Sequence, residues 1–328
     1  MKRRSILLAA SLFTAAATTF TSVGVHAQQA QWPTRPVRLI VPWGAGGSTD
    51  IIARTIAQKL GDRWGQQVIV DNKVGGNSIV GAVEGMRAPP DGYTLFMAHS
   101  QTMSVNPFLY SKLAYDPFKD FTPISVVAAY PLVIMASDAA PGKTMLELIE
   151  AAKKNPDTVT FGSAAGAQIQ TEQWMRDWGV KFRYVPYKSG IDITKALLAG
   201  EIHLGVDAIS NNLAHIKSGK IKGLAVNTSK RMTVLPEVPS MDELKLKHTE
   251  PQIWTGFVGP AGLPPQLQSK IYGDLQAVLA MPDVNEKLVK DLGLEIVAGS
   301  GADDFVKKVK AEQAVIGPLV KELGLKVE

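Results

Sequence analysis

The sequence predicts an α/β fold with two units, each a mostly parallel sheet flanked by helices. Short runs of β-branched residues alternate along the chain with segments of helical periodicity, which is the pattern of α/β folds. The length supports two units, because the 328 residues, even without the first 27, can build two hydrophobic cores.

The first unit is predicted to contain three strands separated by two helices. The apolar run at 37–41 (VRLIV) reads as a buried strand, and a Gly-rich turn leads from it into a helix over 48–60. A strand over 67–70, a helix over 79–86 and a strand over 94–98 complete a parallel β-α-β-α-β unit.

A second unit is expected from about position 126. The stretch 126–137 resembles a long strand that Pro131 interrupts, and a helix over 144–154 opens with Thr144 and Glu147 in the capping-box arrangement. A helix is expected to open near position 168. Further strands are predicted at 159–161, 182–185, 204–208 and 224–227.

The remaining chain closes the predicted architecture. Residues 231–251 are broken by prolines and irregular, and one strand and three helices are expected from Trp254 to Leu323. Two α/β units that face each other leave a cleft at the carboxyl ends of their strands, where ligands bind in open α/β sheets. We therefore expect a ligand site between the units.

The N-terminus has the three parts of a cleavable signal peptide. A basic start (Lys2 to Arg4) precedes an apolar run at 6–20, and a small-residue site ends at Ala27. The apolar run is too short for a stable membrane span and no positive stop follows it, which argues against an anchor. The Arg3-Arg4 pair leaves the general and twin-arginine export routes both open.

Composition excludes several classes of function. The chain has no cysteine, which removes disulfides, thiolate catalysis, Cys-ligated metals and a lipoprotein anchor. Leaving out the three basic residues of the signal, 32 basic residues stand against 30 acidic ones, so the mature charge is about +2. No basic stripe is present, and nucleic acid is therefore not expected as a partner.

The sharpest local feature is the segment Pro42–Asp50 (PWGAGGSTD), between the first strand and the first helix. Its glycines let the backbone approach a ligand, and the first amides of the helix suit a carboxylate or phosphate. An ordinary Gly-rich turn, capped by Ser48 or Thr49, explains the pattern equally well. The segment matches neither the dinucleotide fingerprint nor the Walker loop.

Other candidate sites are weaker. A second Gly-Ser loop, GSAAGAQ at 162–168, also follows a strand and opens a helix, although a plain connection explains it better. The four histidines of the mature chain are far apart, and neither H-E-x-x-H nor G-x-S-x-G occurs. His99 keeps a modest functional interest because it follows the third strand. No cofactor or metal is expected.

Many short segments, in order along the chain, carry a resemblance to a known family. They include Trp32–Val37 (WPTRPV), Val41–Asp50 (VPWGAGGSTD), Pro90–Leu95 (PDGYTL), Asp120–Ile124 (DFTPI), Val185–Lys188 (VPYK), Leu235–Pro239 (LPEVP) and Gly259–Pro264 (GPAGLP). With these segments the sequence resembles the periplasmic solute-binding receptors of the Bug family, the receptors of tripartite tricarboxylate transporters.

The resemblance implies a two-lobed periplasmic binding protein fold of type II-like topology, without enzymatic activity. Lobe one would comprise 28–126 and 250–328, and lobe two would comprise 127–249. The expected protein is a periplasmic monomer that captures a small carboxylate between its lobes and serves membrane transporter subunits or a sensor protein. The alternative is an exported α/β hydrolase with an unrecognised active site, for which no motif supplies a nucleophile and base.

The resemblance also implies which residues contact the ligand. The carboxylate would be held by the first loop and by Ser163 of the second, while the loop after the third strand borders the pocket and Asp207 faces the ligand. The full set of expected ligand-binding residues is Trp43, Gly46, Gly47, Ser48, Ser100, Ser163, Gln168 and Asp207. The second loop departs from the family pattern at Ala165, Ala167 and Gln168, which predicts a bulkier wall and a different ligand shape.

Overall fold

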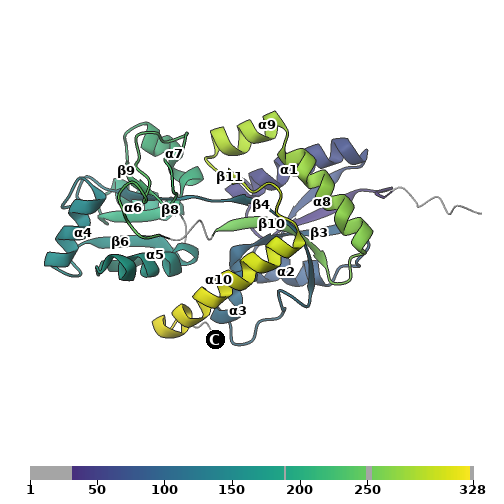
Figure 1. Cartoon of the computed structure of the whole chain (residues 1–328), viewed down its shortest axis with the longest axis horizontal. Helices are drawn as coiled ribbons and strands as arrows, with labels where there is room; N and C mark the ends of the chain where they lie inside the picture. Colours follow the sequence, from purple (N-terminus) through teal and green to yellow (C-terminus); the bar gives the residue numbers. More distant parts are fainter. Residues whose placement is uncertain (1–31, 188–189, 249–252, 326–328) are drawn as a thin grey trace, which may run out of the picture. The chain divides into compact units, whose positions relative to one another are not determined.

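The computed structural model describes residues 32–187, 190–248 and 253–325 (Figure 1). The chain from Pro33 onward is one unit by its contacts. The predicted signal peptide at 1–27 lies outside the described residues. None of the helices in the described part of the chain combines the length and the apolar character needed to cross a membrane.

Among the described residues, one sheet contains six strands in the order β11-β4-β10-β3-β1-β2. Strand β1 pairs in parallel with β2 and β3, whereas β10 runs antiparallel to both β3 and β4, and β11 antiparallel to β4. The strands are β1 (Val37–Val41), β2 (Val68–Asn72), β3 (Thr94–His99), β4 (Phe121–Ala129), β10 (Trp254–Pro260) and β11 (Glu295–Ile296). The helices that pack on this sheet are α1 (Ser48–Trp64), α2 (Ile79–Met86), α8 (Pro265–Leu279) and α10 (Ala302–Leu323).

The second sheet of the described chain has the order β7-β6-β8-β5-β9. Strand β6 is parallel to β7 and β8, and β5 is antiparallel to β8 and β9. Its strands are β5 (Leu132–Ala136), β6 (Thr160–Ala164), β7 (Arg183–Tyr187), β8 (Leu204–Ala208) and β9 (Lys222–Val226). Between them come α4 (Met145–Lys154), α5 (Ala165–Trp178), α6 (Gly190–Leu198) and α7 (Ile209–Lys217). Both sheets carry flanking helices and most strands of each run one way, which confirms the predicted α/β class.

Several elements have the bounds that their local patterns predict. Strand β1, helix α2 and strand β8 match residue for residue. At the start of α4 the capping box is present, because the Glu147 amide donates to Thr144 Oγ1 at 3.2 Å and the Glu147 carboxylate accepts from the Thr144 amide at 3.3 Å.

Within 126–137 the predicted interruption at Pro131 is confirmed, whereas the assignment of the whole stretch to the second unit is wrong. The structure divides this stretch into the end of β4 and the whole of β5, which belong to different sheets and are separated by Tyr130 and Pro131. Strand β4 begins at Phe121, although Pro123 cannot donate to a ladder. A register shift of the β4–β10 pairing beside Pro123 accommodates it.

Three further expectations are corrected. Helix α5 begins at Ala165 rather than near position 168, so Gly162 to Ala164 are the end of a strand. The C-terminal part contains the short strand β11 in addition to β10, because β11 is defined by its pairing with β4. Short helical turns that the periodicity did not predict are η1 (Gln101–Val105), α3 (Asn106–Leu109), α9 (Pro282–Asn285) and η2 (Glu286–Asp291), of which η1 and η2 are π-helical.

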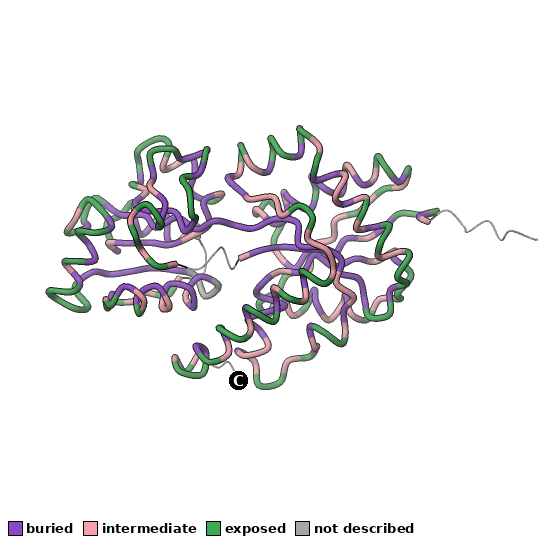
Figure 2. The backbone as a smooth tube through the Cα atoms, in the orientation of Figure 1, coloured by how far each residue is buried: buried purple, intermediate pink, exposed green. Residues whose placement is uncertain are grey.

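Strands β10 and β5 are buried along their whole lengths, as the purple segments of Figure 2 show. Strand β10 passes so close to β4 that only glycine fits at one position. A Cβ atom on Gly256 would lie 2.5 Å from the Ser125 carbonyl oxygen and 3.1 Å from Val126 Cα. Both neighbours are backbone atoms in the middle of a sheet, so neither can turn away.

We expect Gly256→Ala to lower the free energy of unfolding by about 3 kcal/mol, because the backbone must shift to accept one methyl group. The matched control is Gly273→Ala in α8, where a Cβ atom meets nothing within 4 Å. There the same change should stabilise the helix by up to about 1 kcal/mol. Urea denaturation of both variants measures the difference, and equal effects would contradict the close approach.

Candidate functional site

The Gly-rich loop between β1 and α1 is folded around one buried carboxylate. Asp50 is 2% exposed, and its Oδ2 accepts from the Gly46 amide at 2.8 Å and from Arg54 Nε at 2.9 Å. Asn72 donates to Asp50 Oδ1 at 2.9 Å and to the Trp43 carbonyl at 2.8 Å. The loop therefore has a fixed shape before any ligand arrives.

The charge on Asp50 is part of that shape. Burial by itself would raise the pKa of Asp50, but hydrogen bonds from Arg54, Gly46 and Asn72 outweigh it and hold the pKa below its usual range. Gly46 adopts a left-handed φ of +81°. Because its amide donates to Asp50, Gly46 shapes the loop, and the first amides of α1 lie beyond the reach of intrahelical bonding.

The hydroxyls after the loop do not cap the helix. The N-cap of α1 is Gly47, which has no side chain to accept a hydrogen bond. Ser48 Oγ instead lies 2.9 Å from Ser210 Oγ and donates to Asn211 Oδ1 at 3.3 Å. The reading of this segment as an ordinary Ser/Thr-capped turn is therefore wrong.

Ser210 and Asn211 occupy the first turn of α7, directly after β8 of the other sheet. Two strand-to-helix junctions from different sheets thus meet through these side chains and Ser48. Sequence reasoning missed both residues. A signal was available, because they follow the strand at 204–208 as Ser48 follows the strand at 37–41.

Asp207 lies at the same junction, near the end of β8. Its Oδ2 accepts from Asn211 Nδ2 at 3.0 Å and from Asn212 Nδ2 at 2.9 Å. Burial raises the pKa of Asp207 above its usual range, although hydrogen bonds from these two amides act in the opposite direction. A Cβ atom on Gly190 would lie 1.9 Å from the same oxygen, so only glycine fits beside this carboxylate.

The second predicted loop is less open than expected. Ser163 is fully buried in β6, and its hydroxyl donates to the Tyr184 hydroxyl at 3.5 Å within the same sheet. Gln168 is half-buried in the first turn of α5, where its main-chain carbonyl accepts from Thr171 Oγ1 at 2.8 Å. The structure thus brings Ser48 to α7, and it places Ser163 inside a sheet.

His99 ends β3 and connects several predicted residues. Its Nδ1 accepts from the Gln101 amide at 3.1 Å, and Ser100 Oγ lies 3.5 Å from the same nitrogen. Burial lowers the pKa of His99 to about 4, so the ring is neutral at pH 7. The ring packs edge-on against Trp43 at 5.3 Å and tilted against Tyr130 at 5.9 Å.

Trp43 has a buried donor without a partner in the described part of the chain, and Ser100 borders a small cavity. Trp43 Nε1 is buried and has no hydrogen-bond partner among the described residues. Ser100, itself 5% exposed, borders a cavity of about 30 Å³ together with His99 and Ile169, which is room for a water molecule and not for a carboxylate.

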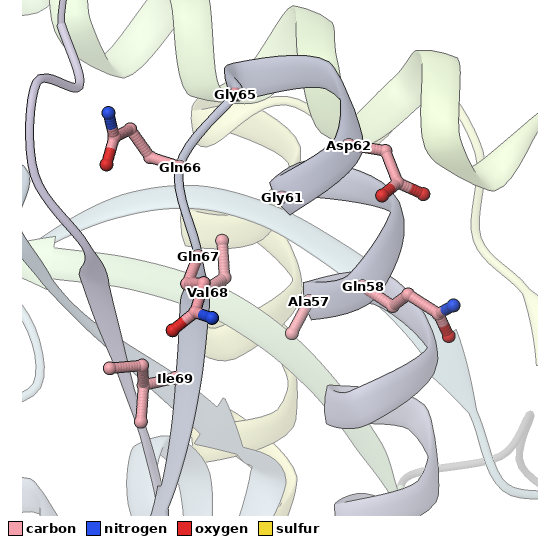
Figure 3. Close-up of a pocket in the computed structure, with 9 residues that line it drawn as sticks. All are labelled: Ala57, Gln58, Gly61, Asp62, Gly65, Gln66, Gln67, Val68 and Ile69. Atoms are coloured by element: carbon pink, nitrogen blue, oxygen red, sulfur yellow. The ribbon is translucent and has the colours of Figure 1, made fainter.

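A larger hollow lies elsewhere on α1. It measures about 400 Å³ and lies between the C-terminal half of α1 and the start of β2, far along the helix from the Gly-rich loop (Figure 3). None of the predicted ligand-binding residues lines it. Within the described ranges, no three His, Asp or Glu side chains gather as a metal site. The chemistry that the α1–α7 junction offers is anion binding by backbone amides and hydroxyls.

Comparisons with known proteins bear on this geometry. A sequence profile described as the tripartite tricarboxylate transporter family receptor matches residues 52–325. A UPF0065 protein of Agrobacterium vitis is 34% identical over 303 residues, which cover 90% of this chain and 86% of the relative. The solved structure of the periplasmic binding protein BugD is 33% identical, with a TM-score of 0.75 over 90% of this chain and 100% of BugD. A structure of an R. palustris protein with adipate is 30% identical, with a TM-score of 0.78 over 89% of this chain and 98% of that one.

Proposed function

The chain belongs to the tripartite tricarboxylate transporter family of receptors, and we propose that it captures a small carboxylate between its two sheets for a membrane transporter. Membership confirms the predicted resemblance to the Bug receptors. It also confirms that the protein is a solute-binding receptor and not an enzyme, so the exported hydrolase is set aside.

One observation carries the choice of ligand class. The N-termini of α1 and α7 come from different sheets and are joined by Ser48, Ser210 and Asn211. Helix N-termini carry partial positive charge and unpaired amides, so a carboxylate between them gains from both. A ligand that contacts both helices favours the arrangement in which they are close, which is the physical basis of closure around a solute.

The other predicted residues are assigned roles from the resemblance to the family. Trp43 Nε1, a buried donor, is proposed to point a hydrogen bond at the ligand or at a water beside it. Gly46 and Gly47 set the approach of the loop, and Ser100, Ser163, Gln168 and Asp207 are proposed to border the ligand. For Ser163, buried in β6, and for Ser100, whose cavity holds a water at most, this requires the surroundings to open when the ligand binds. The proposed lobes are 28–126 with 250–328, and 127–249, and the first boundary falls within β4, which pairs in the first sheet as far as Ala129.

Location and partners follow from the family. Its structurally known members include periplasmic binding proteins, and we propose that this chain reaches the periplasm after cleavage near Ala27. A related R. palustris protein has been seen with adipate. We propose that this chain is a monomer, which binds a small carboxylate and presents it to transporter subunits or to a sensor protein.

A thermal-shift screen of the chain from Gln28 onward tests the proposal, because a ligand of the native state raises the melting temperature by mass action. The panel contains mono-, di- and tricarboxylates, aromatic acids, amino acids and nucleotides, with adipate as the first probe. We expect a saturable shift from one carboxylate class. Shifts from nucleotides alone, or from no compound, would overturn the proposed ligand class.

Asp207 is expected to select the distal group of the ligand by its charge. Asp207→Asn keeps the side-chain shape and removes the charge. The Kd for an amino or hydroxy acid, divided by the Kd for a dicarboxylate, should therefore rise about tenfold. Calorimetric Kd values for one ligand of each kind give the ratio. Asp138→Asn, at an exposed position after β5, is the control, and an unchanged ratio in the Asp207 variant would contradict this role.

A further inference from the structure

Two neighbouring residues between the sheets contact the starts of both helices that the proposed site uses. Tyr130 and Pro131 join β4 of one sheet to β5 of the other, and we call them the first crossover. The Tyr130 amide donates to the Ile253 carbonyl at 2.8 Å. Ile253 directly precedes β10, so the first crossover is bonded to the chain that returns to the first sheet.

The Tyr130 side chain reaches the Gly-rich loop. Its hydroxyl lies 2.9 Å from Thr49 Oγ1, in the first turn of α1, and both residues are buried, at 3% and 8% exposure. The ring packs on His99, which packs on Trp43 of the loop. The Tyr130 hydroxyl therefore fixes the start of α1 against the first crossover.

The next residue reaches the other helix. The Pro131 carbonyl accepts from the Ile209 amide at 3.0 Å, and Ile209 is the first residue of α7. The link to α7 is made by backbone and the link to α1 by one side-chain hydroxyl. A change at the Tyr130 side chain thus loosens one helix and leaves the other in place.

We propose that Tyr130 is a positioning residue of the receptor, which sets the distance and orientation between the starts of α1 and α7. This inference rests on the proposed function for its consequence, because the two helix starts are the proposed carboxylate site. In this proposal Tyr130 does not touch the ligand, and it acts through Thr49 and the Gly-rich loop. Motion of one sheet relative to the other bends the chain at the crossovers, so a contact at this point converts that motion into movement of the loop.

The test uses Tyr130→Phe, which keeps the ring against His99 and removes only the hydroxyl. The matched control is Tyr115→Phe, since Tyr115 is also buried, at 6% exposure, and its hydroxyl donates to the Thr102 carbonyl at 2.7 Å. The Tyr115 hydroxyl also accepts from Asn106 Nδ2 at 3.1 Å, and the Tyr130 hydroxyl also bonds the Thr255 side chain. Each variant therefore loses two buried hydrogen bonds, and the two should lose similar thermal stability. Only the first variant removes the link between the crossover and α1.

The primary readout needs no ligand. The natural chain has no cysteine, so Gln58→Cys on α1 and Lys195→Cys on α6, both exposed, accept spin labels cleanly. We expect pulsed electron spin resonance to show a broader distance distribution in the Tyr130 variant than in the parent. An unchanged distribution, or an equal broadening in the Tyr115 variant, would overturn the inference.

The second readout is the affinity for the best carboxylate of the thermal-shift panel. We expect a Kd roughly fivefold weaker in Tyr130→Phe and unchanged in Tyr115→Phe, the size of one neutral hydrogen bond. If the parent binds no carboxylate, the proposed function fails, while the label distances still decide whether Tyr130 positions the helices.

Discussion

Gly46→Val is expected to weaken carboxylate binding at least about 100-fold while the protein stays folded. Gly46 has a φ of +81°, which a β-branched residue adopts only with strain. The backbone must therefore turn, and the Gly46 amide moves away from the Asp50 carboxylate that now accepts it at 2.8 Å. A Cβ atom at this position meets nothing within 4 Å, so the core is not overpacked.

The control for strain lies at the other end of the same helix. Gly65 caps α1 with a φ of +63°, and its Cβ position is equally open. Gly65→Val should cost similar stability and leave the affinity unchanged, because only the end far from the Gly-rich loop is altered. Calorimetric titration of both variants separates the effects. Retained binding in Gly46→Val, or a loss in both variants, would show that the loop does not hold the ligand.

Asp50→Asn is expected to lower the free energy of unfolding by about 3 kcal/mol at pH 7. Asp50 is buried and accepts from Gly46, Arg54 and Asn72. In asparagine an NH₂ group replaces one carboxylate oxygen, so this group faces at least one of the three hydrogen-bond donors and cannot accept from it. The substitution also removes the negative charge that faces Arg54. Asp62→Asn, at an exposed position of the same helix, should change stability little.

The loss of unfolding free energy in Asp50→Asn should become smaller as the pH falls. The folded pKa of Asp50 lies below its unfolded value, so its stabilisation is present above the unfolded pKa, about 3.9, and is lost as pH falls through the folded pKa. Urea midpoints from about pH 3 to pH 7 should therefore converge for parent and variant at the acid end. Parallel curves would mean that Asp50 is not the ionised centre of the loop.

Local pattern predicts those elements whose signals are local. The strand at 37–41, the helix at 79–86 and the strand at 204–208 have the predicted ends. In the stretch 126–137 the break at Pro131 was visible, but nothing in the stretch says that its two halves belong to different sheets. That choice depends on the pairing of β4 with β10, which comes more than a hundred residues later.

The site divides in the same way. The Gly-rich loop was visible as a loop between a strand and a helix, and Asp50 stood within the quoted motif. The partners of its hydroxyls were not visible, because Thr49 and Tyr130 are 81 residues apart and Ser48 and Ser210 are 162 apart. Contacts of this separation are set by how the two sheets are joined, which no periodicity records.

Capture between the two sheets is tested by following backbone amide resonances while adipate, or the best carboxylate of the panel, is titrated into selectively labelled protein. We expect the amides of Ser48 and Thr49 at the start of α1, and of Ser210 and Asn211 at the start of α7, to shift together with one saturation curve. Shifts confined to one of the two helices, or to the hollow between α1 and β2 in Figure 3, would contradict capture of a carboxylate between the two sheets.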